Sequence, residues 1–266
     1  MRFFDTAPLY GHGLAESRLG AVLRTKPRED FVLATKVGRL LREGAPPEPG
    51  QSYVDVPPVN PVFDFSYDGV MRSLEESLGR LGLDRVDVLH IHDPDDHYEE
   101  AVAGAYRALD RLRSEGTIGA VGAGMNQAEM LARFARDANF DCFLLAGRYT
   151  LLDRIGAQEL LPLCVERGIA VVAGGVFNSG ILADPESDTH YNYRPAPPEL
   201  IRRALELKKV CERHGVDLKA AALQFPLRHP AIPIVLTGPR SVAELEENIR
   251  MFETPIPDDL WKELEA

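Results

Sequence analysis

Four side chains that can move a proton follow short apolar runs early in the chain. Asp5 and Tyr10 lie in Asp-Thr-Ala-Pro-Leu-Tyr-Gly, Lys36 lies in Ala-Thr-Lys-Val-Gly, and His92 lies in His-Ile-His-Asp-Pro. A free phenol titrates at a pH of about 10, so without help it is a poor acid and a poor base at neutral pH. An adjacent ammonium lowers that pKa, and a carboxylate keeps the ammonium charged when it is buried. We therefore expect Tyr10 to be an acid/base tuned by Lys36 and Asp5, and His92 to orient a substrate oxygen.

A proton moved at a carbonyl or alcohol oxygen requires a second event at the carbon atom. The sequence shows no cluster with metal-ligand spacing, and no metal is expected. The three cysteines, Cys142, Cys164 and Cys211, are widely and unevenly spaced, which suggests buried thiols rather than a disulfide framework or a zinc site. Hydride transfer to or from a nicotinamide cofactor is the simplest partner reaction.

Each of these residues also has a purely structural interpretation. Asp5 alone could cap a turn, and Lys36 alone could be a surface charge at a strand end. His90 and His92 point the same way if the segment is a strand. We assign the site to His92, because it directly precedes Asp-Pro, and expect His90 to be structural. The combination of four residues at successive strand ends favours chemistry over the separate explanations.

Strands and helices are expected to alternate along the chain. Short apolar runs without polar alternation are typical of strands buried on both faces of a parallel sheet. They occupy residues 2–5, 31–36, 86–91, 118–122, 140–145, 169–173 and 233–236. Helical spacing occupies residues 68–80, 98–115, 128–137, 158–167, 198–214, 242–251 and 258–264.

This alternation predicts one α/β domain spanning residues 1–266, and two closures compete for it. A doubly wound dinucleotide domain would carry a glycine-rich fingerprint after its first strand, and none is present. Polar residues instead follow many different strands, which favours a TIM-type (β/α)8 barrel. About seven strands are visible, so we expect the barrel to lack its first βα unit at the N-terminus. Residues 40–64 and 183–197 are expected to be long irregular loops that carry specificity.

Composition narrows the possible partners. The chain has 266 residues, of which 45% are hydrophobic and 27% charged, and a formal net charge of −11. A net acidic protein is not steered towards nucleic acid or an anionic membrane, so neither is expected as a partner. No apolar run is long enough to span a bilayer and no charged-then-apolar leader is visible, which favours the cytoplasm. The oligomeric state stays open.

The motifs resemble those of the aldo-keto reductase superfamily. The resemblance rests on the Asp5–Tyr10 segment, the Thr-Lys strand end, Ile-His-Asp-Pro, and the stretch from Gly238 to Glu-Glu-Asn. Residues 68–75, 145–152 and 177–182 resemble the branch of pyridoxal 4-dehydrogenases and D-threo-aldose (L-fucose type) 1-dehydrogenases. The resemblance implies that Tyr10 is the acid/base, with Lys36, Asp5 and His92 in the roles above.

The same resemblance implies a cofactor site. Asn126 would hold the nicotinamide carboxamide, and the loop at residues 237–241 would hold phosphate through Gly238, Arg240 and Ser241. Glu247 and Asn248 would lie near the adenine. Many NADP-dependent members carry an arginine three residues before the Glu-Asn pair, where this chain has Glu244. A carboxylate there repels a 2′-phosphate and favours NAD, whereas Arg240 could still hold the phosphate of NADP.

Three hypotheses follow. The first is an NAD(P)-dependent oxidoreductase acting on a carbonyl or cyclic hemiacetal, such as an aldose sugar or pyridoxal, to give a lactone. The second is a protein that binds the cofactor but is catalytically impaired, because a strand–helix unit expected before Asp5 is missing. The third is that Met1 lies inside a longer gene product, which we favour over an evolved seven-stranded protein.

Overall fold

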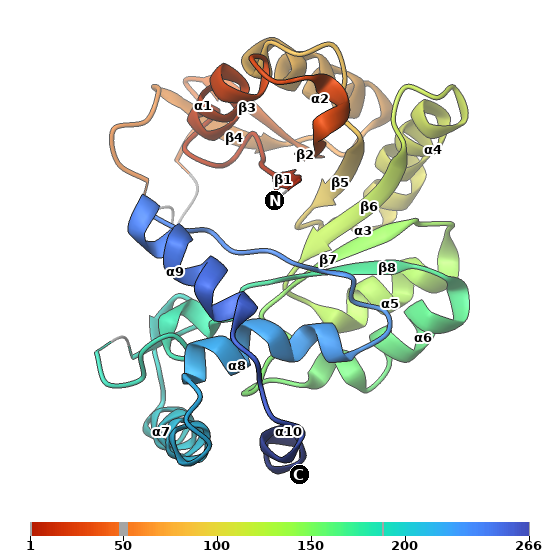
Figure 1. Cartoon of the computed structure of the whole chain (residues 1–266). Coiled ribbons are helices and arrows are strands. Elements are labelled where there is room, and N and C mark those ends of the chain that lie inside the picture. The colour runs from red at the N-terminus through yellow and green to blue at the C-terminus, as the bar shows by residue number, and fades with distance from the viewer. Residues whose placement is uncertain (1, 48–52, 188, 266) are drawn as a thin grey trace. The chain divides into compact units, whose positions relative to one another are not determined.

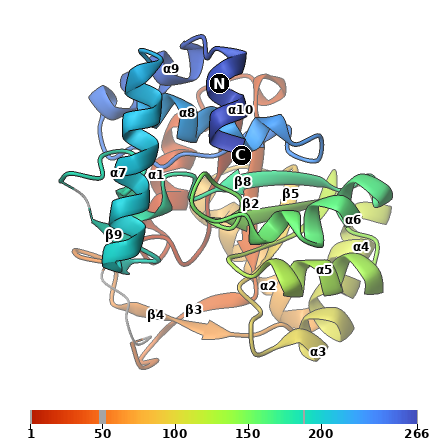
Figure 2. The same cartoon turned by 90° about the horizontal axis from the view of Figure 1, so that it is seen from below.

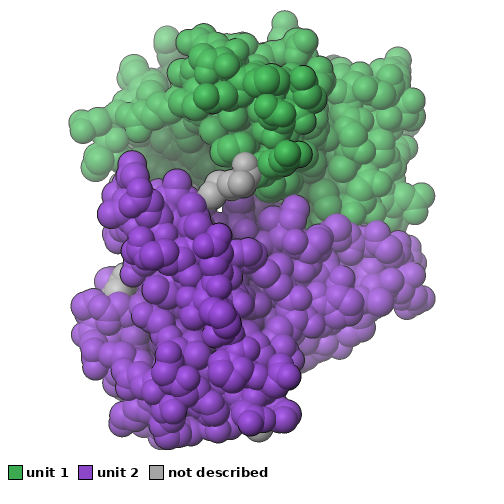
Figure 3. Space-filling model, viewed as in Figure 1, with its two compact units in different colours: residues 1–125, 136–143 green, residues 126–135, 144–266 purple. Residues whose placement is uncertain are grey.

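The chain falls into two compact units in the computed structural model, which describes residues 2–47, 53–187 and 189–265 (Figures 1 and 3). Unit 1 contains the described residues up to 125 together with residues 136–143. Unit 2 contains residues 126–135 and the described residues from 144 onwards. The expectation of a single domain stays a prediction.

The described residues contain eleven strands, seven of them in one sheet with the order β1-β2-β5-β6-β7-β8-β11. The pairs β1–β2, β2–β5, β5–β6 and β8–β11 are parallel, as the buried apolar runs predict. The sheet strands are β1 (Phe3–Asp5), β2 (Val32–Val37), β5 (Val88–His92), β6 (Ala120–Met125), β7 (Cys142–Ala146), β8 (Ala170–Gly174) and β11 (Ile234–Val235).

Helices follow most of these strands. They are α1 (Leu14–Leu23), α2 (Tyr67–Leu81), α3 (Tyr98–Glu100), α4 (Arg107–Ser114), α5 (Ala128–Asp137), α6 (Leu160–Arg167), α7 (Pro198–Arg213), α8 (Leu218–Gln224), α9 (Val242–Glu253) and α10 (Asp258–Glu265). Short 3₁₀ turns occur at Arg28–Asp30, Ile155–Ala157, Asn178–Gly180 and Phe225–Arg228. None of the described helices is long and apolar enough to cross a membrane.

The helix expected over residues 98–115 contains a π-helical segment. The structure has α3, a π-helix at Ala101–Tyr106, and α4 in succession. Gly104 lies in the π-helix against the segment before α2, where an added Cβ would stand 2.4 Å from the Phe65 carbonyl oxygen. This close approach of two backbones admits only glycine, and π-bulges of this kind are frequent at functional sites.

The two segments expected to be irregular loops contain antiparallel hairpins. Within residues 40–64, β3 (Arg39–Glu43) pairs with β4 (Val59–Phe63), a separate two-stranded ribbon in Figure 2. Within residues 183–197, β9 (His190–Tyr191) pairs with β10 (Arg194–Pro195). The prediction of loops without secondary structure was therefore wrong at these places, because short strands among Pro and Gly gave no clear period. Residues 48–52 and 188 of these segments lie outside the described residues.

Two helices had no predicted counterpart. In α1, Glu16 is fully buried, where it accepts hydrogen bonds from Arg80 at 2.6 Å and Thr35 at 2.7 Å. Gly20 of α1 packs so closely on α2 that a Cβ would meet the Leu81 carbonyl oxygen at 2.0 Å. The buried glutamate and the glycine conceal the helical pattern of α1, and α8 is short and alanine-rich.

The core of unit 2 lies among α7, α8 and α10. Residues such as Leu182, Ala204, Phe225, Leu260 and Trp261 form one buried cluster there. Gly168, which ends α6, has φ of 69°, the left-handed conformation that stops a helix. Phe177 of the segment after β8 and Met251 of α9 pack against this core, and α9 also carries the predicted cofactor residues Glu247 and Asn248.

Candidate active site

Lys36 and Asp5 form a buried ion pair at the ends of the neighbouring strands β1 and β2 in unit 1. Lys36 Nζ lies 2.5 Å from Asp5 Oδ2 and donates to the Thr6 carbonyl oxygen at 2.9 Å. The two side chains are only 2% and 3% exposed. Burial opposes the charge on Lys36, but Asp5 and then Tyr10 raise the pKa of Lys36 above its usual value. The structure thus brings together the two tuning residues predicted from the sequence.

Tyr10 lies beside this pair. Lys36 Nζ is 4.6 Å from the centroid of the Tyr10 ring. Burial raises the pKa of the Tyr10 phenol, and the charge and hydrogen bond of Lys36 work against this rise without reversing it. Lys36 lowers the pKa of Tyr10, as expected, but burial raises it by more, so the pKa lies above its usual value. The phenol is protonated at neutral pH, which suits it to donate a proton.

His92 completes the group predicted in unit 1. Its ring stands edge-on to that of Tyr10, with centroids 5.7 Å apart. Burial first, and then the charges of Lys36, Arg39 and His90, keep the pKa of His92 well below its usual value. A neutral imidazole with one N–H can donate a hydrogen bond to a carbonyl or alcohol oxygen.

His90 lies two residues earlier on β5 and is fully buried. Burial and the charge of Lys36 lower its pKa to about 3. An added Cβ on Gly122 of β6 would stand 2.2 Å from His90 Nδ1, so the ring fits only because that position is glycine. Neither ring nitrogen of His90 has a hydrogen-bond partner within the described residues. His90 packs in the interior of unit 1, as the sequence suggested.

Two residues near His92 had no role in the sequence prediction. Asp93 Oδ2 lies 3.4 Å from His92 Nε2, and the Arg39 guanidinium lies 3.3 Å from the same carboxylate oxygen. Arg39 opens the hairpin strand β3, and its guanidinium lies 4.6 Å from the Phe63 ring centroid. The position of Asp93 directly after His92 could have identified it from the sequence. Arg39 could not be identified in this way, because the hairpin brings it to Asp93.

The predicted cofactor residues lie in unit 2. A cavity of about 1050 Å³ is lined there by residues that follow β6, β7, β8 and β11 and by residues of α8 and α9. Five of the six predicted residues line it: Asn126, Gly238, Arg240, Glu247 and Asn248. Ser241 is the exception, since it caps α9 by accepting a hydrogen bond from the Glu244 N–H at 3.1 Å. Its role in cofactor binding stays a prediction.

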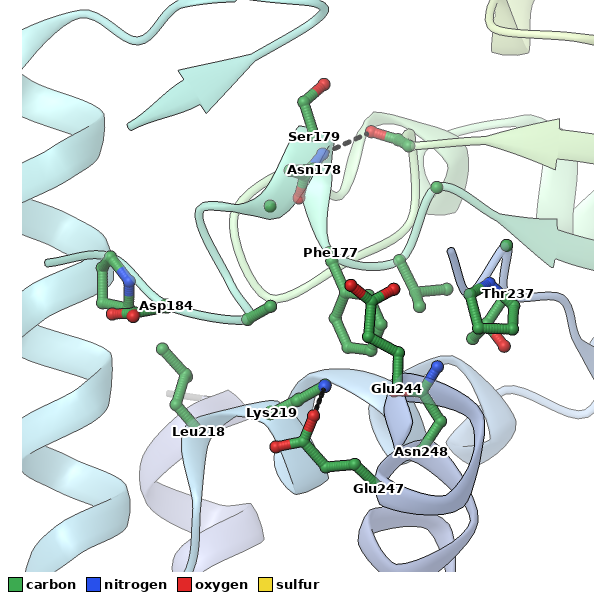
Figure 4. Close-up of a pocket in the computed structure, with 18 of the residues that line it drawn as sticks. Phe177, Asn178, Ser179, Asp184, Leu218, Lys219, Thr237, Glu244, Glu247 and Asn248 are labelled. Carbon is green, nitrogen blue, oxygen red and sulfur yellow. Dashed lines mark hydrogen bonds and ion pairs between the residues drawn. The ribbon is translucent and has the colours of Figure 1, made fainter. Parts of the chain in front are cut away.

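Two of the ion pairs in the cavity lining involve predicted cofactor residues. Glu247 pairs with Lys219 of α8, as the dashed line in Figure 4 shows. Glu244 accepts from the Arg240 N–H at 2.7 Å and pairs with the Arg240 guanidinium at 3.0 Å. Lys219 was missed by sequence reasoning, because one lysine at a helix start carries no periodic signal. Its Nζ also lies 5.7 Å from the Phe177 ring centroid.

The volume and the chemistry of the cavity suit a dinucleotide. Its volume lies at the upper end of the range for small-molecule sites. Asn248 is buried, lines the cavity, and its Oδ1 has no hydrogen-bond partner in the described residues. A buried acceptor without a donor destabilises the protein. The amino group of an adenine could donate the missing hydrogen bond. The Lys219 and Arg240 cations are suited to phosphate oxygens.

These groups support proton transfer rather than thiol chemistry. The three cysteines are free thiols, and burial raises the pKa of Cys142 and of Cys164 to about 12 each. A neutral thiol is a weak nucleophile. Tyr10, Lys36, Asp5 and His92 together can bind an oxygen atom and exchange one proton with it.

Sequence comparison gives close relatives of known activity. The chain is 42% identical to pyridoxal 4-dehydrogenase from Microbacterium luteolum, over 100% of this chain and 84% of that protein. It is 43% identical to D-threo-aldose 1-dehydrogenase from a Pseudomonas species, over 99% of this chain and 83% of that protein. These are the two kinds of enzyme that the sequence resembles.

Solved structures share the fold. An aldo-keto reductase from Bacillus halodurans, in its holo form, matches with a TM-score of 0.75 and 26% identity, over 100% of this chain and 82% of that one. A glycerol dehydrogenase from Gluconobacter oxydans matches with a TM-score of 0.79 at 24% identity, over 100% and 80%. The prediction of a (β/α) barrel fold with about seven strands in this chain is confirmed.

A family model completes the comparison. The model described as the Aldo/keto reductase family matches residues 1–266. Together with relatives above 40% identity, this match shows more than a shared fold. The chain therefore belongs to the aldo/keto reductase family, whose members are NAD(P)-dependent oxidoreductases.

Proposed function

We propose that this protein oxidises the cyclic hemiacetal of an aldose sugar, or of pyridoxal, to a lactone with NAD as the preferred cofactor. The observation that carries the proposal is the buried group of Tyr10, Lys36, Asp5 and His92, which is built to exchange a proton at one oxygen atom. The substrate classes are taken from the two most similar relatives reported above.

In the oxidation, His92 donates a hydrogen bond to the hemiacetal hydroxyl oxygen and fixes its position. Tyr10 takes the proton of that hydroxyl as the C–O bond becomes a carbonyl. A bound nicotinamide cofactor supplies the acceptor for the hydride that leaves the same carbon. Lys36, kept charged by Asp5, stabilises the phenolate form of Tyr10 that this step requires.

The raised pKa of Tyr10 gives this proposal a pH dependence. The oxidation needs the phenolate and the reverse reduction needs the phenol. Because burial raises the pKa of Tyr10, we expect oxidation to speed up as the pH rises above neutrality and reduction to be favoured at neutral pH.

Glu244 supports NAD over NADP. It lines the cavity and engages both the backbone N–H and the guanidinium of Arg240. The one cation of the loop at residues 237–241 is therefore already paired with a carboxylate, which would also repel a 2′-phosphate. Dissociation constants for both cofactors test this preference, and tighter binding of NADP would overturn it.

The direct test is production of NADH, followed by absorbance, with L-fucose, D-arabinose and pyridoxal as substrates. We expect Tyr10→Phe to lower kcat by roughly 10²- to 10⁴-fold while cofactor binding stays within a factor of about two. The change removes one hydroxyl from a residue of unit 1 and leaves the cavity of unit 2 intact. Cofactor binding without turnover of any of these substrates by the wild-type protein would refute the proposal.

A further inference from the structure

A second carboxylate–guanidinium pair lies beside the proton-transfer group and takes no part in the chemistry above. Arg39 and Asp93 meet at 3.3 Å, and Asp93 Oδ2 is 3.4 Å from His92 Nε2. The Arg39 side chain is 8% exposed and that of Asp93 is 33% exposed. The guanidinium is thus the buried anchor, and the carboxylate is the member of the pair that a ligand can reach.

The backbone at Asp93 holds this carboxylate in an unusual position. Asp93 has φ of 41°, in the left-handed region, and its N–H donates to the Gly124 carbonyl oxygen at 3.0 Å. Left-handed conformations cost free energy for residues with a side chain, although aspartate tolerates them better than most, and they cluster at functional sites. Here the turn directs the side chain back towards His92 instead of onwards with the chain.

We propose that Asp93, held by Arg39, accepts a hydrogen bond from the substrate hydroxyl on the carbon next to the reacting carbon. This inference rests on the proposed function, and it narrows the substrate to compounds that carry such a vicinal hydroxyl. Asp93 Oδ2 is 3.4 Å from His92 Nε2. A substrate oxygen that binds Tyr10 and His92 Nε2 would therefore lie close to Asp93 Oδ2. A hydroxyl on the adjacent carbon of the same molecule then reaches the carboxylate.

The chemistry of the pair fits a hydroxyl better than an apolar group. A carboxylate is an acceptor only, and a charged acceptor forms stronger hydrogen bonds to hydroxyl donors than a neutral one. The Arg39 guanidinium, 3.3 Å away, holds the Asp93 carboxylate in place. A substrate that lacks the vicinal hydroxyl would not form this hydrogen bond, which gives discrimination between otherwise similar molecules.

The experiment compares L-fucose with 2-deoxy-L-fucose, which differ only in the vicinal hydroxyl. Binding is measured by titration calorimetry with NADH or NADPH present, so that no oxidation occurs. The test variant is Asp93→Gly, because glycine removes the carboxylate and adopts φ of 41° without strain. We expect it to weaken L-fucose binding by roughly 10- to 100-fold and 2-deoxy-L-fucose binding by no more than about twofold.

Two further variants separate recognition from structure. Asp93→Asn keeps the shape and the backbone conformation, and we expect an intermediate loss confined to L-fucose. Asp96→Asn removes the same charge from an exposed position three residues later and should change neither sugar. Thermal unfolding of each variant checks that the fold is intact.

The outcomes distinguish this inference from the proposed function. Equal losses for both sugars in Asp93→Gly, or no loss for either, would overturn the role of Asp93, as would a wild-type protein that binds neither sugar. Wild-type binding with the expected selectivity but without NADH production in the turnover assay would sink the proposed oxidation and leave the Asp93 site standing.

Discussion

One ion pair in the candidate site of each unit shows a contrast in burial. In unit 1 the pair Lys36–Asp5 is almost completely buried, with side chains 2% and 3% exposed. In unit 2 the Arg240 side chain of the pair Arg240–Glu244 is 86% exposed. Buried pairs are held rigidly and are costly to break, whereas exposed pairs exchange readily with water and ions. The Lys36–Asp5 pair therefore has the rigidity that the proposed proton transfer needs, whereas the exposed Arg240 can exchange Glu244 for an incoming ligand.

The largest expected effect comes from breaking the buried pair. Lys36→Met should lower the free energy of unfolding by about 3–5 kcal/mol, because it leaves Asp5 buried without its counter-charge. The matched change in unit 2, Lys219→Met, removes a cation from a partly exposed pair and should cost less than about 1 kcal/mol. Urea unfolding of both variants measures the difference.

A double variant, Asp5→Asn with Lys36→Met, provides the control for this comparison. It removes both charges, so it should recover part of the stability lost by Lys36→Met while activity stays lost. Equal destabilisation by the two single lysine variants would contradict the contrast between the units.

The next largest effect concerns stability at low pH. We expect the buried His90 to lower the free energy of unfolding as the pH falls. Burial lowers the pKa of folded His90 to about 3, against 6.5 for an ordinary histidine. As the pH falls below about 6.5, the unfolded chain binds a proton that the folded protein refuses, so stability falls until the pH reaches about 3. The slope is about 1.4 kcal/mol per pH unit for one such group.

His90→Leu should therefore reduce the loss of unfolding free energy between about pH 7 and pH 5, and His92 should account for part of the slope that remains. His190→Gln, at an exposed position on β9, serves as the matched change in unit 2 and should leave the slope as it is. Denaturant unfolding at several pH values measures these slopes. An unchanged slope in His90→Leu would show that His90 is not kept neutral in the folded protein.

The smallest effect is expected at the exposed pair of unit 2. Glu244→Gln removes the carboxylate that engages Arg240, so NADP should gain about 5- to 10-fold in affinity relative to NAD. Salt at about 0.5 M should reduce this change, because exposed charges are screened. Glu246→Gln, at an exposed position on the same helix outside the cavity lining, is the control. Fluorescence titration with NAD and with NADP measures both dissociation constants. An equal ratio of the two constants in the wild type, Glu244→Gln and Glu246→Gln would refute the role of Glu244.

Much of the architecture could be predicted where the local pattern is strong. Helix α5 begins and ends where its spacing predicts, at Ala128 and Asp137, and β1 and β2 lie where their apolar runs predict. Strand β6 was expected at residues 118–122 and is found at Ala120–Met125. Its glycines and alanines carry little strand propensity, but Gly122 accommodates the buried His90 ring from the neighbouring strand. Tertiary packing, and not propensity, sets that strand.

The chemistry-bearing residues divide in the same way. The types and spacing of Asp5, Tyr10, Lys36 and His92 were sufficient to predict a proton-transfer group, because residues at the ends of adjacent parallel strands meet at one edge of a sheet. The direction of the Tyr10 pKa could not be predicted, since it depends on the balance between burial and the charge of Lys36. Two ion pairs could not be predicted either, because each joins elements that are distant in the sequence. They are Arg39–Asp93 and Lys219–Glu247.

The sequence by itself determined the family, the succession of the seven strands of the main sheet, and the four residues that we propose as the proton-transfer group. These follow from local periodicity and from residue types at strand ends, which are properties of short segments. Only the tertiary structure decided how deeply each charge is buried, which cation each carboxylate engages, and that a hairpin carries Arg39 to the side of His92. Burial and long-range contacts depend on the packing of whole elements, and no short segment contains that information.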